Sequence, residues 1–116
     1  EDAMEKYFYK KELEIRLETL GDKHPDTAKS YKAVGEVFFK AVNFESAEEM
    51  YRKALEIDLE AQPDIHRVLS ERYSDMVQIL MEQSKFDEAI KMHKKSLALK
   101  LHIHGGEEDH SDIAWE

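Results

Sequence analysis

A repeat of 42 residues runs through this chain of 116 residues and restricts the folds that it can adopt. When the sequence is shifted by 42 positions, aromatic residues fall on aromatic residues, as with Tyr9 on Tyr51 and Tyr31 on Tyr73. A fixed period of this length is typical of solenoids, in which supersecondary units stack and each unit packs against its neighbours. We therefore expect an array of similar units and not one closed core.

Within each period the apolar residues recur at helical spacing. The pattern predicts helices over residues 2–20, 26–41, 44–60, 65–83 and 86–103, with a sixth beginning near Asp112. Only four glycines and two prolines are present, which leaves little material for a turn-rich β fold. The predicted fold class is all-α.

The connection after the first helix contains a histidine between two aspartates. His24 beside Asp22 and Asp26 could form a site, or the segment could be a corner between two helices. Gly21 suits a helix end in the left-handed conformation, and Pro25 suits a first helical turn. Asp22 or Asp26 is expected to accept hydrogen bonds from the free N–H groups of that turn. These features favour the corner.

Small residues alternate with aromatic residues along the predicted packing seam. Small side chains let two helices approach closely, and the aromatic rings fill the space beside them. The predicted seam consists of Tyr31, Gly35, Phe38, Ala47, Tyr51, Ala54, Tyr73 and Ala89.

The order of aromatic, small and aliphatic positions resembles the tetratricopeptide repeat. The residues that carry the resemblance are Tyr31, Val34, Gly35, Phe38, Phe44, Ala47, Tyr51 and Ala54. The period of 42 and the corner at residues 20–28 are similar to the kinesin light chain and nephrocystin type. The resemblance implies a right-handed superhelix of antiparallel helix pairs, whose first helices line a concave wall.

The chain is expected to be one domain and a fragment of a longer array. Residues 1–24 would be the second helix of a preceding repeat with its corner, and residues 105–116 the start of a further repeat. Residues 25–62 and 63–104 would be the two repeats between them.

The resemblance implies a protein-binding module whose concave groove holds a peptide or helix of a partner. Alignment with the repeat pattern predicts groove positions Lys29, Lys32, Glu36, Phe39, Lys40, Glu71, Ser74, Gln78, Met81 and Glu82. Three lysines and one glutamate stand among the first five positions, which favours an acidic segment or a carboxylate, with Phe39 and Met81 as the apolar floor.

The alternative is a structural element that associates with copies of itself through open repeat ends. Tyr7 and Phe8 near one end and Trp115 near the other are the candidate contact residues. Exposed apolar seams of this kind favour end-to-end association, here as a homodimer.

The composition argues against several other functions. A net charge of −9 disfavours binding to nucleic acid. The sequence contains no run of 18 apolar residues, so no membrane span is predicted. The sequence has no cysteine, no Gly-x-Ser-x-Gly motif and no glycine-rich phosphate loop. We therefore predict a cytoplasmic protein that is not an enzyme and has no cofactor.

Histidines raise two further questions. Imidazole and carboxylate groups that can bind zinc or nickel gather near the C-terminal end, at His102, His104, Asp109, His110 and Asp112. The repeat places His110 where His24 stands in the first corner, so no metal site is predicted. His93 falls at the packing position of Tyr51, which predicts a histidine tucked into the core.

Overall fold

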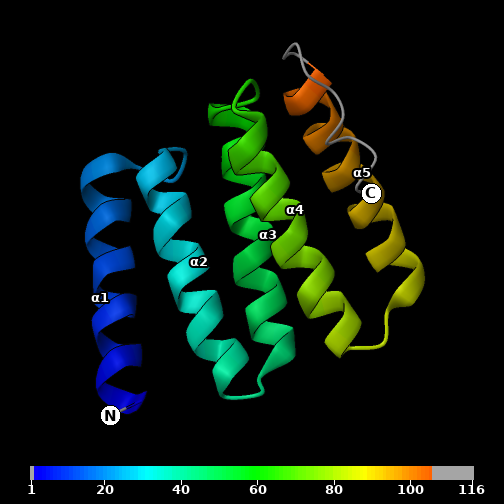
Figure 1. Cartoon of the computed structure of the whole chain (residues 1–116). Helices are drawn as coiled ribbons and strands as arrows, with labels where there is room; N and C mark the ends of the chain where they lie inside the picture. Colours follow the sequence, from blue (N-terminus) through cyan, green and yellow to red (C-terminus); the bar gives the residue numbers. More distant parts are fainter. Residues whose placement is uncertain (1, 106–116) are drawn as a thin grey trace. The chain divides into compact units, whose positions relative to one another are not determined.

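A computed structural model describes residues 2–105 of the chain. Those residues form five helices and no strand (Figure 1). The helices are α1 (Asp2–Leu20), α2 (Pro25–Lys40), α3 (Phe44–Ala61), α4 (His66–Glu82) and α5 (Phe86–Gly105). The prediction of an all-α fold is confirmed, and each helix end lies within two residues of its predicted position. The sixth helix predicted near Asp112 lies outside the described residues.

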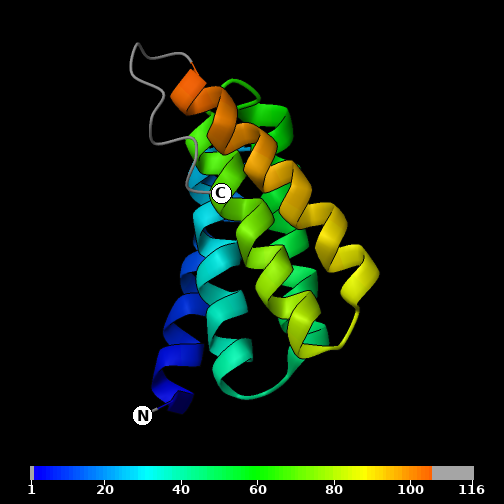
Figure 2. The same ribbon diagram turned by 45° about the vertical axis from the view of Figure 1, so that its right-hand side comes forward.

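The described residues divide into two compact units, with the boundary between residues 62 and 63. In the first unit α2 packs against both α1 and α3, and in the second unit α4 packs against α5. Consecutive helices within each unit run antiparallel (Figures 1 and 2). None of the helices in residues 2–105 combines the length and apolar character that a membrane span requires.

A tight turn with a left-handed residue joins α2 to α3. Val42 has φ 63° and donates its N–H to the carbonyl oxygen of Phe39, while the N–H of Asn43 bonds that of Phe38, each at 2.9 Å. This pair of bonds is a Schellman motif. The Asn43 Oδ1 then accepts the N–H of Ser46 at 3.3 Å. One residue therefore ends the turn and caps the next helix.

The turn between α4 and α5 repeats this geometry. Ser84, which is 42 residues beyond Val42, has φ 60°. Its N–H bonds the carbonyl oxygen of Met81 at 3.0 Å, and the N–H of Lys85 bonds that of Leu80 at 2.9 Å. The sequence period is thus also a period of the backbone conformation.

The seam between α2 and α3 has no room for a side chain at Gly35. A Cβ placed there would lie 2.8 Å from Cδ1 and Cε1 of the Tyr51 ring and 3.2 Å from Cβ of Met50. Ala47 and Ala54 are both fully buried, and Tyr51 is only 4% exposed. Small residues therefore set the distance between these two helices.

The second unit uses serine where the first uses alanine. In the first unit Ala28 and Ala54 are buried together, with Tyr31 packed against them. The positions 42 residues later are Ser70 and Ser96, which are also buried. Their Oγ atoms lie 3.3 Å apart, and the Ser96 hydroxyl also donates to the carbonyl oxygen of Ser70 at 3.3 Å. These hydrogen bonds compensate for the burial of the hydroxyl groups.

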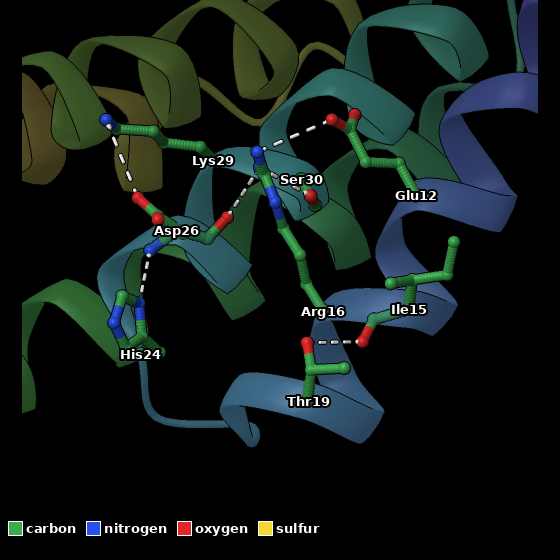
Figure 3. Close-up of polar contacts among 8 residues, drawn as sticks. All are labelled: Glu12, Ile15, Arg16, Thr19, His24, Asp26, Lys29 and Ser30. Atoms are coloured by element: carbon green, nitrogen blue, oxygen red, sulfur yellow. Dashed lines mark hydrogen bonds and ion pairs between the residues drawn. The ribbon is translucent and has the colours of Figure 1, made fainter.

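The corner between α1 and α2 is closed by backbone and side-chain hydrogen bonds (Figure 3). Gly21 has φ +92° and ends α1, while Pro25 begins α2. The capping residue is His24, whose Nδ1 accepts the N–H of Asp26 at 3.0 Å. The expectation that Asp22 or Asp26 caps this helix is wrong, because the imidazole of His24 already occupies the acceptor position.

Arg16 ties α1 to this corner (Figure 3). Its guanidinium donates to the Ser30 Oγ at 3.0 Å and to the carbonyl oxygen of Asp26 at 3.1 Å, and it pairs with Glu12 at 3.4 Å. His24, Asp26 and Arg16 thus serve the connection between helices. The histidine and aspartates of this segment belong to a corner.

Candidate functional site

The predicted binding positions of the first unit lie along α2. Lys29, Glu36 and Lys40 are exposed, and Lys32 and Phe39 are half-buried. All five therefore keep part of their surface accessible. The Phe39 ring packs edge-on against the Phe44 ring, with 5.4 Å between their centroids. This contact fixes Phe39 at the end of α2 next to the turn.

Each of the three lysines on this face has an acidic neighbour. Lys29 Nζ lies 3.8 Å from Asp26, and Lys32 Nζ lies 3.9 Å from Glu36. Lys40 reaches α1, where its Nζ lies 3.5 Å from Glu5. The face is therefore less cationic than a count of three lysines against one glutamate implies, since two further carboxylates come from outside the predicted set.

The predicted positions of the second unit lie along α4. Glu71, Gln78 and Glu82 are exposed, and Met81 is 51% exposed. Ser74 is half-buried, and its Oγ lies 3.1 Å from the Oγ of Ser96 on α5. Ser74 is thus engaged within the helix pair, whereas the other four side chains are available to solvent.

An open apolar hollow of about 260 Å³ lies between α4 and α5. It is lined by Val77, Met81, Ala89, Ile90 and His93. Met81 and Ile90 are each more than half exposed, and Ala89 at the base is buried. The hollow therefore offers apolar surface beside the exposed face of α4.

His93 is exposed, so the prediction of a core histidine is wrong. The repeat explains the difference. Val77 and His93 occupy the positions of Gly35 and Tyr51 in the first unit, where the ring leaves no space even for a Cβ. A valine in place of the glycine takes up the volume of the ring, and the residue in place of Tyr51 is displaced toward solvent.

The first helix presents aromatic side chains to solvent. Tyr7 and Phe8 are 64% and 62% exposed. Lys11 lies over the Tyr7 ring, with Nζ 6.0 Å from its centroid. A hydrogen bond to Glu14 at 3.2 Å, together with the charge of that carboxylate, raises the pKa of Lys11. Trp115, the third residue predicted for self-association, lies outside the described residues.

Two histidines of the second unit lie together. The rings of His66, in the first turn of α4, and His102, near the end of α5, have centroids 4.3 Å apart at an interplanar angle of 66°. Asp109, His110, Asp112 and the side chain of His104 lie outside the part of the chain that the structure describes. Among the described residues, no group of three or more histidine or acidic side chains has a metal-binding arrangement.

Recurring turns and close-packed helix pairs define a helical-repeat protein. Two family models, each described as tetratricopeptide repeat, match residues 7–60 and 69–112. The chain is a tetratricopeptide repeat protein, and repeats of this kind indicate a protein–protein interaction module. A comparison with curated proteins gave no match.

Sequence reasoning missed two features of these faces. The acidic partners of the lysines could have been found in part, since Asp26 stands three residues before Lys29 on the same helix. The pairing of His66 with His102 joins residues far apart in sequence. The pairing could have been predicted from the expected antiparallel arrangement of these two helices, because that arrangement places the start of one helix beside the end of the other.

Proposed function

We propose that the chain binds a peptide or helical segment of another protein through the exposed face of α2, with the exposed face of α4 as a further contact region. The observation that carries this proposal is the combination on α2 of the exposed Lys29 and Lys40 with the half-buried Phe39. Cationic groups beside an aromatic ring suit an acidic segment with an apolar anchor.

The ion pairs on α2 are compatible with an acidic partner. Lys29 and Lys40 have side chains that are 69% and 66% exposed, and each lies more than 3.4 Å from its carboxylate. Exposed pairs of this kind contribute roughly 0–1 kcal/mol. Carboxylates of a partner can therefore replace Asp26 and Glu5 as neighbours of these lysines at little cost.

A comparative capture experiment tests the assignment. Partners retained by the wild-type chain are compared with those retained by a triple Lys→Gln variant at Lys29, Lys32 and Lys40. A matched triple variant at Lys53, Lys91 and Lys94 changes the charge equally at exposed positions elsewhere. We expect the α2 variant alone to lose partners. Identical partners on both variants would show that the α2 lysines are not the binding face.

The finer classification belongs to the same proposal. The 42-residue period and the Leu-Gly-x-x-His-Pro-x-x-Ala corner at residues 20–28 support the kinesin light chain and nephrocystin type of repeat. We place the repeats at residues 25–62 and 63–104, preceded by residues 1–24 and followed by residues 105–116. The absence of cysteine supports a cytoplasmic location.

Self-association is a second candidate function. It is favoured by the exposure of Tyr7 and Phe8 on α1, beside Met4, which is 74% exposed. Exposed apolar patches of this kind mark interaction surfaces. Trp115 would be the corresponding residue near the other end of the chain.

Light scattering over a wide concentration range tests this second candidate. We expect a concentration-dependent dimer that is lost in a Tyr7→Ser/Phe8→Ser variant and in Trp115→Ala. The matched control is Met81→Ser/Ile90→Ser, which removes two apolar side chains of the second unit that are 51% and 53% exposed. A monomer at every concentration would exclude self-association through these residues.

A further inference from the structure

The histidine pair His66–His102 is the only close pair of imidazole rings among the described residues, and the packing seams do not require it. His66 is half-buried at the beginning of α4, and His102 is exposed near the end of α5. Both figures of the whole chain show these two helix ends on the same side of the antiparallel pair (Figures 1 and 2). Each imidazole is therefore held by a different helix and accessible from solvent.

The separation of the rings fits two ligands of one ion. Imidazole nitrogens bind divalent zinc at about 2.0–2.1 Å, so two of them in a tetrahedral site lie about 3.3 Å apart. Ring centroids 4.3 Å apart put the two imidazoles close enough to share one ion once the side chains rotate to aim a nitrogen of each at it.

We propose that His66 and His102 form a binding site for a late divalent transition-metal ion, with Cu²⁺ bound more tightly than Ni²⁺ or Zn²⁺. Imidazole suits these ions, and copper has the highest affinity for nitrogen ligands in the first-row series. Because no third described histidine or acidic side chain completes the group, water fills the remaining coordination positions.

One ring of the pair borders open space. His66 borders an open pocket of about 420 Å³, which Asp64 and Arg67 also line. The opposite charges of Asp64 and Arg67 offset each other there. At longer range the net charge of −9 favours the approach of a cation.

Metal binding at this pair would connect the first turn of α4 to the last turns of α5. An ion that binds the folded helix pair and not the unfolded chain stabilises the fold, and the melting temperature keeps rising with the logarithm of the free-ion concentration above Kd. The site is thus a clamp on the second unit and is independent of the proposed partner-binding face on α2.

The test is a titration of untagged chain with CuSO₄, NiCl₂ and ZnCl₂ at neutral pH by calorimetry, paired with thermal unfolding. We expect one ion bound per chain and a higher melting temperature, which EDTA reverses. MgCl₂ is the negative control, because Mg²⁺ prefers oxygen ligands. His66→Gln and His102→Gln should each lose both signals, with circular dichroism confirming that they remain helical.

Two control variants identify the ligands. His93→Gln removes an exposed histidine of the same helix and should bind metal as the wild type does. His104→Gln/His110→Gln removes the histidines that follow His102 and should also retain binding. The proposal is overturned if His66→Gln binds as the wild type does, if the His104/His110 variant loses binding, or if none of the three ions binds.

Discussion

Substitution of Gly35 by alanine isolates the close contact between α2 and α3. Two effects of opposite sign act on the free energy of unfolding. Alanine in a helix interior is favoured over glycine by about 1 kcal/mol. Against this, the new methyl group would lie 2.8 Å from two ring atoms of Tyr51, and overpacking of a core costs about 1–3 kcal/mol.

The steric effect should prevail because the ring has little freedom to move. Tyr51 is 4% exposed, and Met50 also lies 3.2 Å from the new methyl position. We therefore expect Gly35→Ala to destabilise the chain by about 1 kcal/mol net, within a range of about 0–2 kcal/mol. In a Tyr51→Ala background both ring contacts are removed, and the same substitution should stabilise by about 1 kcal/mol.

Urea denaturation followed by circular dichroism measures the free energy of unfolding of the wild type, of the two single variants at positions 35 and 51, and of the double variant. Glu36 is the exposed neighbouring position, and the difference in unfolding free energy between Glu36→Ala and Glu36→Gly measures how strongly this helix favours alanine over glycine. The reasoning predicts a coupling energy of about 1–3 kcal/mol between positions 35 and 51. If Gly35→Ala stabilised the wild type as much as it stabilises the Tyr51→Ala variant, the close contact would not limit this seam.

Three further substitutions test other contacts by the same denaturation assay. Val42→Gly should stabilise by about 1 kcal/mol, since a β-branched residue at φ 63° is strained and Val42 is exposed; no change would mean that the turn relaxes. Arg16→Met should cost about 1–3 kcal/mol through the lost hydrogen bonds to Ser30 and Asp26, whereas a neutral result would show that water replaces them. Ser96→Ala should cost about 1 kcal/mol because the Ser70 hydroxyl loses its buried partner, and Ser70→Ala added to it should cost little more.

The sequence predicted the helices and their connections because both depend on residues close together in the chain. Helical spacing of apolar residues placed the five described helices, and Gly21 and Pro25 marked the first corner. The cap itself was assigned to the wrong side chain. Asp22, His24 and Asp26 all carry acceptors near the helix start, and in the structure the Nδ1 of His24 accepts the N–H of Asp26.

The candidate faces were harder to predict because the charge of a surface depends on neighbouring side chains outside the aligned positions, some of them on other helices. A list of positions on α2 contains three lysines, but Glu5 reaches Lys40 from α1 and Asp26 reaches Lys29 from the preceding turn. The left-handed turn at Val42 was also not predicted, because neither glycine nor asparagine stands there. The same conformation and the same pair of Schellman hydrogen bonds recur at Ser84, where again neither glycine nor asparagine stands.

Comparison of the two units shows which property of the seam the repeat preserves. Ala28 and Ala54 correspond to Ser70 and Ser96, so polarity changes while the side chains stay small and buried. Where the volume of a side chain changes instead, the residue that packs against it changes its burial as well. Valine replaces Gly35 at position 77, and the residue that replaces Tyr51, His93, is exposed. Close packing makes volume the stricter requirement, because hydroxyl groups can bond each other across the seam but a ring and a valine cannot share one space. The exposed apolar hollow beside α4 is therefore a consequence of a paired substitution within the seam.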